Sequence, residues 1–307
     1  MGVPILHEVT PRRRRVVLQP VAAIVPNTMS MSTHLPPWLV PRHRKGPALE
    51  RMTPVLRRCG VSTICEQARC PNVGECFAAG TATFLILGEV CTRGCTYCAV
   101  GHGRPRPPDA EEAERIAAAA RELGLDYVVV TSVTRDDLAD GGASQFAATV
   151  AALRDALPSA RVETLVPDFA GDEAALRQVI AARPDVVGHN VETVPRLYPE
   201  VRPGADYQRS LALLRSAANA GLRTKSGAML GLGEELDEAR EVMRDLREAR
   251  VGILTLGQYL QPTRRHLPVA RYIEPQEFAA LEEEAKAMGF DDVKAGPFVR
   301  SSYRAGH

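Results

Sequence analysis

Six cysteines form two triplets near the front of this 307-residue chain, and cysteines in such patterns are typical metal ligands. The first triplet is 65-CEQARCPNVGEC-76 and the second is 91-CTRGCTYC-98, with a seventh cysteine, Cys59, just before them. A disulfide framework would spread its cysteines along a short secreted chain. The clustering therefore indicates metal ligation in a reducing compartment and predicts a cytoplasmic protein.

The second triplet, Cys91, Cys95 and Cys98, has the spacing C-x3-C-x2-C within one short loop. This spacing matches neither the paired CxxC of zinc ribbons nor the four-cysteine runs of ferredoxins. Three cysteines on a four-iron cluster leave one iron without a protein ligand, and that iron can bind a small molecule. A structural zinc knuckle, or a redox-active CxxC formed by 95-CTYC-98, is the alternative interpretation.

The first triplet, Cys65, Cys70 and Cys76, also supplies one thiolate fewer than a closed four-ligand site needs. Cys59 would complete a structural zinc site, which is chemically reasonable. A second iron–sulfur cluster, with its fourth ligand from elsewhere, is the other interpretation. The residues alone leave both open.

The chain around and after the cysteines alternates between strand-like and helix-like patterns, which predicts an α/β fold with a parallel sheet. Short apolar runs predict six strands, at residues 82–88, 126–133, 161–167, 185–192, 223–230 and 251–260. Stretches of helical period predict helices at residues 110–123, 143–157, 172–183, 207–221, 235–249 and 275–288.

The second triplet directly follows the first predicted strand, and (β/α) barrels carry their sites at the C-terminal ends of strands. Six units are fewer than the eight of a full barrel, so we expect a partial (β/α)6 barrel of the TIM type. The expected regions are an N-terminal arm at 1–35, a cysteine-rich extension at 36–80, the barrel at 81–288, and a tail at 289–307 that closes over the cavity.

The N-terminal arm resembles a signal peptide only in part. A run of arginines precedes an apolar stretch, but Pro20 interrupts that stretch and no small-residue cleavage pattern follows. We interpret residues 1–35 as a disordered arm or an over-extended start, with Met29 or Met31 as the initiator.

The composition argues against two other classes of partner. The formal net charge is +1 and aromatic residues make up 5% of the chain, so neither a basic field nor base-stacking platforms indicate nucleic-acid binding. No run approaches eighteen consecutive apolar residues, so the sequence predicts no membrane-spanning helix.

The second triplet, placed after the first strand of a barrel, resembles the radical S-adenosylmethionine (SAM) superfamily, and Tyr97 before its last cysteine fits that pattern. A narrower resemblance covers about residues 36–305, where the chain is similar to lipoyl synthases. It rests on 64-ICEQARCPNVGECFAAGTATFLILGEVCTRGCTYC-98, 130-VTSVTRDDLADGGASQF-146, 189-HNVETVPRLYPEVRPGADYQRSL-211, 225-KSGAMLGLGE-234, 255-TLGQYLQPTRRHLPV-269 and 296-GPFVRSSYRA-305.

This resemblance implies two 4Fe–4S clusters, with SAM as a co-substrate. The second triplet then holds a cluster whose open iron binds SAM. The first triplet holds an auxiliary cluster whose fourth ligand is a serine of 300-RSSY-303, and Ser302 is the expected ligand, with Ser301 as the alternative. Cys59 is then an incidental thiol.

The implied reaction inserts two sulfur atoms at C6 and C8 of an octanoyl chain on a lysine of a lipoyl carrier domain. The resemblance points to carriers in E2 subunits and in the glycine cleavage H protein. A radical made from SAM removes hydrogen from these unactivated positions, and the auxiliary cluster donates the sulfur. An electron donor such as flavodoxin or ferredoxin, and an iron–sulfur carrier protein, are the other implied partners.

Strand ends supply the candidates for holding SAM. Ser132 lies at the end of the second predicted strand, and Asn190 and Glu192 alternate to one face of the fourth, so these side chains are expected to point into the cavity. Together with Tyr97 they are the predicted cofactor-binding residues. Barrel packing or loop capping is the alternative role for Asn190 and Glu192.

Other polar residues near the strand ends are expected to be structural. The charged run 135-RDD-137 is expected to fix a loop, although its place after the second strand keeps a catalytic role open. His102, His189 and His266 are interpreted as structural.

Two further functional hypotheses compete with this one. The first is a different radical SAM enzyme with an auxiliary cluster, similar to biotin synthase or to a peptide-modifying sulfur inserter, and the upstream triplet with its distant RSSY motif argues against it. The second is a non-catalytic iron–sulfur carrier or a zinc-stabilised binding module. Iron, zinc and sulfide analysis separates these possibilities.

Overall fold

The computed structural model describes residues 35–40, 47–68, 70 and 72–306. The predictions for an N-terminal arm and for a start at Met29 or Met31 lie outside these residues. From Pro36 onward the chain forms one compact unit. No helix in the described ranges has both the length and the apolar character needed to cross a membrane.

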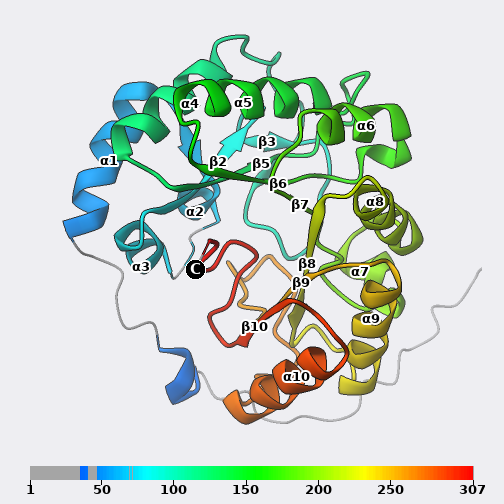
Figure 1. Cartoon of the computed structure of the whole chain (residues 1–307). Coiled ribbons are helices and arrows are strands. Elements are labelled where there is room, and N and C mark those ends of the chain that lie inside the picture. The colour runs from blue at the N-terminus through cyan, green and yellow to red at the C-terminus, as the bar shows by residue number, and fades with distance from the viewer. Residues whose placement is uncertain (1–34, 41–46, 69, 71, 307) are drawn as a thin grey trace, which may run out of the picture. The chain divides into compact units, whose positions relative to one another are not determined.

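Eight strands of the described chain form one curved sheet in the order β1-β2-β5-β6-β7-β8-β9-β10. All neighbours pair in parallel except the short edge strand β1 with β2. The strands are β1 (Ser62–Thr63), β2 (Thr81–Ile86), β5 (Tyr127–Ser132), β6 (Arg161–Leu165), β7 (Val186–Gly188), β8 (Arg223–Leu230), β9 (Ile253–Gln258) and β10 (Asp292–Gly296). Figure 1 shows the strands curving around an interior with helices outside. The predicted α/β partial barrel is confirmed.

The main helices cover the outer face of this sheet (Figure 1). They are α4 (Glu112–Leu123), α5 (Ala143–Ala156), α6 (Glu173–Ala181), α8 (Tyr207–Asn219), α9 (Leu236–Glu248) and α10 (Pro275–Ala287). In α9, Ala239, Val242, Met243 and Leu246 are buried at intervals of three and four, which places one apolar stripe on the sheet. Strands β2 and β9 are buried along their whole length, as expected for parallel strands covered on both faces.

Shorter elements carry the cysteines and the connecting loops. Three helices precede the barrel: α1 (Pro47–Cys59), α2 (Ile64–Gln67) and α3 (Val73–Ala78). A two-stranded ribbon of β3 (Val90–Cys91) and β4 (Gly101–His102) frames the second triplet. The remaining turns are α7 (Tyr198–Val201), η1 (Pro37–Leu39), η2 (Phe169–Gly171) and η3 (Pro195–Leu197).

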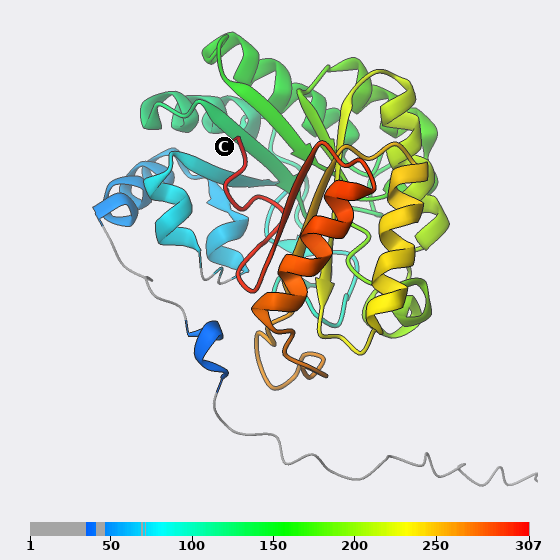
Figure 2. The same ribbon diagram turned by 60° about the horizontal axis from the view of Figure 1, so that its bottom comes forward.

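The tail differs from its prediction in one respect. Residues 289–307 were expected to form a tail after the barrel, and no strand was predicted there, but β10 lies within them and pairs with β9 in parallel register. Only Val293 of this strand is buried, so no apolar run marks it in the sequence. After β10, the tail crosses from the last strand of the sheet toward the first ones, as Figure 2 shows in red.

Candidate functional site

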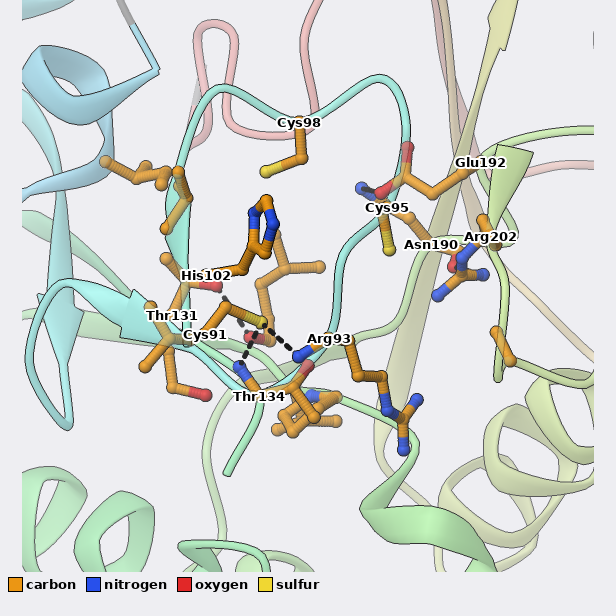
Figure 3. Close-up of a pocket in the computed structure, with 18 of the residues that line it drawn as sticks. Cys91, Arg93, Cys95, Cys98, His102, Thr131, Thr134, Asn190, Glu192 and Arg202 are labelled. Atoms are coloured by element: carbon orange, nitrogen blue, oxygen red, sulfur yellow. Dashed lines mark hydrogen bonds between the residues drawn. The ribbon is translucent and has the colours of Figure 1, made fainter. Parts of the chain in front are cut away.

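A cavity of about 170 Å³ lies at the C-terminal ends of β2, β5, β6 and β7. The second triplet lines it, together with residues from the ends of these strands. Figure 3 shows the sulfurs of Cys91, Cys95 and Cys98 around one space, with the ring of His102 beside it. The sequence prediction that this triplet meets the strand ends at one cavity agrees with this placement.

Backbone groups hold the first cysteine of the second triplet. The sulfur of Cys91 accepts hydrogen bonds from the backbone N–H groups of Arg93 and Thr134, at 3.4 and 3.3 Å. Gly103 N–H donates to the carbonyl oxygen of Cys91 at 2.9 Å and closes the ribbon behind the loop. Backbone hydrogen bonds therefore fix the position of Cys91 within the loop.

The thiols of this triplet fit an iron–sulfur cluster. Burial raises the pKa of Cys98 to about 11, and the negative charges of Cys95 and Cys91 act in the same direction. Burial also raises the pKa of Cys95. Thiols of this kind remain protonated at neutral pH unless positive charge lies against them, and cluster irons supply that charge.

The spacing of the sulfurs also bears on the zinc alternative. Within the described ranges, no three His, Cys, Asp or Glu side chains converge closely enough to hold one metal ion. In a four-iron cluster each thiolate binds a different iron, so the sulfurs stand farther apart than around a single zinc. A cluster therefore does not require three side chains to converge on one point.

An arginine inside the triplet ties its loop to two neighbouring strands. Arg93 donates to both carboxylate oxygens of Asp136, at 2.7 and 2.8 Å, and forms an ion pair with the buried Asp168 at 2.7 Å. Arg135 is buried and binds Asp137 at 2.8 Å and the Leu87 carbonyl at 3.2 Å. The run 135-RDD-137 therefore fixes loops, in agreement with its interpretation from the sequence.

The four predicted cofactor-binding residues all line the cavity: Tyr97, Ser132, Asn190 and Glu192. Tyr97 hydrogen-bonds to the Glu192 carboxylate, and Asn190 Nδ2 donates to Glu192 Oε1 at 3.1 Å. Burial raises the pKa of Glu192. The hydroxyl of Ser132 is buried and has no hydrogen-bond partner among the described residues, which is typical of a group that meets a ligand.

The prediction that strand alternation orients Asn190 and Glu192 is wrong in detail. Strand β7 ends at Gly188, and Glu192 has a left-handed backbone with φ of 65°. A single bridge to Ala228 of β8 holds Glu192 in place. A turn after the strand, and not the pleat of the strand, brings both side chains to the cavity.

Arg202 is a cavity residue that the sequence prediction missed. It is buried, and its Nη1 donates to the carbonyl oxygens of Asn190 and Val191, at 2.9 and 3.2 Å, and to the hydroxyl of Tyr198 at 3.1 Å. Its charge opposes the pKa rise that burial causes in Glu192. It lies inside the similar run 189–211, but no spacing rule marks it there.

Of the three histidines that were interpreted as structural, His189 and His266 have structural contacts. His189 is buried, with Nδ1 at 2.8 Å from the Val166 oxygen and Nε2 at 3.0 Å from the Ser210 hydroxyl. His266 Nε2 lies 2.9 Å from the carbonyl oxygen of Cys98. The ring of His102 lines the cavity.

The first triplet forms a second group of buried thiols, on and around α2 and α3. Burial and the negative charge of Cys70 raise the pKa of Cys65 to about 12. Burial raises the pKa of Cys76 to about 11 and also that of Cys70. The three thiols thus lie close enough to repel one another as thiolates. Cys59 ends α1 and packs against the hydrophobic core.

The C-terminal tail lies along this first triplet. The positive charge of Arg300 acts on Cys70, and the backbone N–H of Arg304 hydrogen-bonds to the sulfur of Cys76. Between them, the hydroxyl of Ser301 accepts a hydrogen bond from Asn190 Nδ2, on the wall of the first cavity. Ser302 is the next residue.

Other contacts fasten the tail to the extension that carries the triplet. Asn72 Nδ2 donates to the carbonyl oxygen of Phe298, and the Tyr303 hydroxyl donates to Glu75 Oε1 at 3.0 Å. Residues 298–304 are therefore held beside α3, more than two hundred positions away in sequence.

Comparisons with known proteins can be set beside this geometry. The family model of the radical SAM superfamily matches residues 85–246. A lipoyl synthase of Thiobacillus denitrificans is 50% identical, and the match covers 99% of this chain and 97% of the relative. A lipoyl synthase of Trichlorobacter lovleyi is 56% identical, with 88% of this chain and 96% of the relative covered. A third, from Xylella fastidiosa, is 54% identical over 89% and 74%.

Solved structures resemble this chain in fold. SuiB of Streptococcus suis, bound to its precursor peptide SuiA, has a TM-score of 0.56 at 11% identity, covering 80% of this chain and 52% of that chain. Methylornithine synthase has a TM-score of 0.51 at 13% identity, covering 73% and 76%. At these identities the likeness shows the fold alone.

Proposed function

The chain belongs to the lipoyl synthase family of radical SAM enzymes, and from that membership we propose how its two cysteine triplets and its tail divide the reaction. As a member of that family it is a sulfur-inserting enzyme with a 4Fe–4S cluster and SAM as cofactors, and it acts on lipoyl carrier proteins. The residue roles below are our proposal.

The second triplet holds the SAM-binding cluster. A cluster bound there, with SAM, supplies a carbon-centred radical that can remove hydrogen from an unactivated C–H bond. Tyr97, Ser132, Asn190 and Glu192 bind SAM. Because Ser132 is buried with no partner among the described residues, it has a hydroxyl available for that ligand.

The first triplet holds an auxiliary 4Fe–4S cluster. Ser302 is the fourth ligand of this cluster, and the cluster is the source of the inserted sulfur. Ser301 is the weaker candidate because its hydroxyl already binds Asn190. Ser302 lies between Arg300, whose charge acts on Cys70, and Arg304, whose N–H binds the Cys76 sulfur. A cluster at this place supplies the sulfur atoms that the product gains.

The single observation that carries the proposal is the hydrogen bond between Asn190 and Ser301. It joins the wall of the SAM cavity to the residue next to the proposed auxiliary ligand. Radical formation and sulfur donation must act on one substrate chain, and reacting atoms have to come within near-contact distance. A tail that touches both sites meets that requirement.

The finer identities of the partners are also proposed. The substrate is an octanoyl-lysine of a carrier domain, in an E2 subunit or the glycine cleavage H protein, and sulfur enters at C6 and C8. Electrons come from a flavodoxin or ferredoxin, and an iron–sulfur carrier protein rebuilds the auxiliary cluster. The clustering of the cysteines, unlike the spread of a disulfide framework, favours the cytoplasm as the compartment.

The test is anaerobic incubation of the reconstituted protein with SAM, dithionite and an octanoyl-lysyl peptide. We expect about eight irons per chain, acid-labile sulfide and a peptide mass gain of two sulfurs. Ser302→Ala should lose the auxiliary cluster and the mass gain, whereas Ser301→Ala should retain the cluster. Zinc without sulfide would overturn the cluster assignment, and an intact auxiliary cluster in Ser302→Ala would overturn the ligand assignment.

A further inference from the structure

Residues 297–306 form a strap across the open side of the partial barrel. The strap begins where β10, the last strand of the sheet, ends. It finishes beside β2, β5 and β6, on the other side of the opening, as its contacts with Thr81, Tyr127 and Arg161 show. Figures 1 and 2 show this crossing in red.

Cationic side chains from two distant strands bind the end of the strap. Lys294 Nζ of β10 donates to the carbonyl oxygen of Arg304 at 2.7 Å. Arg161 Nη2 of β6 donates to the carbonyl oxygen of Gly306 at 2.6 Å. Both bonds are charge-assisted, and such bonds are about twice as strong as neutral ones.

The residue between these two contacts is packed into the barrel. Ala305 is 3% exposed and packs on Tyr127 and Val129, and its carbonyl oxygen accepts a hydrogen bond from Thr81 Oγ1 at 3.4 Å. Gly306 has a φ of 90°, and a side chain there would overlap the Tyr127 ring. The strap end is therefore fitted to this position and does not merely cover it.

The side chains that contact the strap end, Arg161 and Tyr127, are held in place by contacts of their own. The Arg161 guanidinium lies 5.0 Å from the centre of the Tyr127 ring. The Tyr127 hydroxyl donates to Glu163 at 2.7 Å, and Glu163 pairs with the buried Lys225 at 2.9 Å. Because Arg161 is already stacked in place, binding the strap costs little side-chain freedom.

The strap end is close to the proposed cluster ligand. A single residue, Tyr303, separates Ser302 from Arg304. Lys294 binds the carbonyl oxygen of Arg304, and the N–H of Arg304 reaches the sulfur of Cys76. Any movement of the backbone at 304–306 is therefore transmitted to Ser302 and to the first triplet.

We propose that Arg161 and Lys294 are positioning residues for sulfur insertion, which hold Ser302 at the first triplet by binding the carbonyl oxygens of the strap end. This proposal rests on the assignment of Ser302 as a ligand of the auxiliary cluster. Both side chains act through their hydrogen bonds to the strap.

The test uses reconstituted holoprotein and the variant Arg161→Met/Lys294→Met, which removes both donors and keeps apolar stems. We expect release of the auxiliary-cluster iron to a ferrous chelator to become at least about fivefold faster, the factor for losing one hydrogen bond. The iron of the second triplet should be retained. In a Ser302→Ala background, which should already lack the auxiliary cluster, the same pair of substitutions should cause no further loss of iron, because the strap then has no ligand to hold.

Loss of iron from the second triplet in the Ser302→Ala background, or an unchanged release rate in the double variant, would overturn the proposal, since a general loss of stability would not be confined to the first triplet. Lys294→Arg alone keeps a cationic donor at this position, so this variant should retain the auxiliary-cluster iron nearly as well as the parent. Arg177→Met on α6, where the arginine pairs with Glu173 at the surface, is the matched control and should leave release unchanged. If the double variant does not fold, the single Lys294→Met protein is measured in the same way.

Failure of this proposal is distinguishable from failure of the proposed function. If the parent protein forms the two-sulfur product but Ser302→Ala releases iron like the parent, Ser302 is not a ligand and the positioning role fails with it. The sulfur-insertion activity would then still stand. Absence of the product in the parent would count against the function itself.

Discussion

At the scale of single residues, Ser132 offers the simplest test of the SAM cavity. Its buried hydroxyl lines the cavity and finds no partner in the described chain. We expect Ser132→Ala to weaken SAM binding by roughly fivefold, the effect of losing about 1 kcal/mol from one hydrogen bond. Equilibrium binding of SAM to the reconstituted protein measures this.

Ser226 supplies the matched control for that substitution. Its hydroxyl is also buried without a partner in the described chain, but it lies on β8 and does not line the SAM cavity. Ser226→Ala should leave SAM affinity unchanged. Equal losses in both variants would show that a buried serine matters here for packing and not for the ligand.

His189 gives a pH dependence of stability. Burial, together with the nearby charge of Arg202, lowers its pKa from 6.5 to about 4. Below pH 6.5 the unfolded chain binds a proton at this position that the folded chain does not, so stability is complete above 6.5 and falls as the pH drops toward 4. At pH 5.5 the loss from this group is about 1.4 kcal/mol.

The measurement is urea unfolding at about pH 7.5 and at pH 5.5, compared between the parent and His189→Gln. The glutamine variant should start less stable but lose about 1.4 kcal/mol less between the two pH values. An identical pH dependence in both proteins would contradict the assignment of a neutral, buried imidazole.

The cavity residues that the sequence predicted are placed by local spacing and strand ends, whereas the residue that it missed is placed by tertiary contacts. The second triplet is recognisable because its chemistry depends on local spacing, and Tyr97 lies within it. Ser132 reaches the cavity from the end of β5, and Asn190 and Glu192 reach it from the turn after β7. Arg202 was missed because its bonds to the carbonyl oxygens of Asn190 and Val191 exist only once the loop after β7 has folded back. Tertiary contacts of this kind leave no period or spacing in a sequence.

At the scale of elements, hydrophobic periodicity predicted six strands and six helices, because parallel strands are continuous apolar runs and the covering helices are amphipathic. Their ends were predicted less well, and the strand predicted at 185–192 ends at Gly188. Strand β10 was missed because its sequence, DVKAG, carries one buried apolar residue. It forms because β9 offers it an unpaired edge, which is a property of the assembled sheet.

The contact between β9 and the strap predicts the effect of an element-level substitution. A methyl group at Gly257 would overlap the backbone oxygen of Val299, which cannot move without displacing the tail. We expect Gly257→Ala to destabilise this contact by about 1–3 kcal/mol, to speed proteolysis within residues 297–306 and to lower the content of the auxiliary cluster. Limited proteolysis and iron analysis measure both effects.

The cross-strand partner of Gly257 is the control. Gly296 of β10 pairs with Gly257 in the sheet, and a methyl group there would meet only the Val299 side chain at an ordinary 3.5 Å. Gly296→Ala should therefore leave the tail and the cluster content close to those of the parent. If the two variants behave alike, close packing of the tail on β9 is not what holds it.

At the scale of the whole molecule, the two triplets depend on different parts of the chain. The second triplet is framed by the ribbon of β3 and β4 and by the ends of neighbouring strands, all within the barrel. The first triplet lies where the extension before the barrel meets the strap at the end of the chain, since Asn72 and Glu75 bind residues of the strap. Removing the strap should therefore separate the two sites functionally.

A protein that ends at Gly296 tests this separation. It keeps every strand of the sheet, so we expect it to retain about four irons per chain, to bind SAM and to cleave it under reducing conditions. It should lose the auxiliary iron and form no sulfur-containing peptide, because the triplet then lacks both Ser302 and the Arg304 N–H group that binds Cys76. Iron analysis, SAM cleavage and peptide mass are measured on the same preparation. Retention of about eight irons would show that the first triplet holds its cluster without the strap. Loss of SAM cleavage would show that the strap also supports the SAM cavity, through the hydrogen bond from Asn190 to the Ser301 hydroxyl.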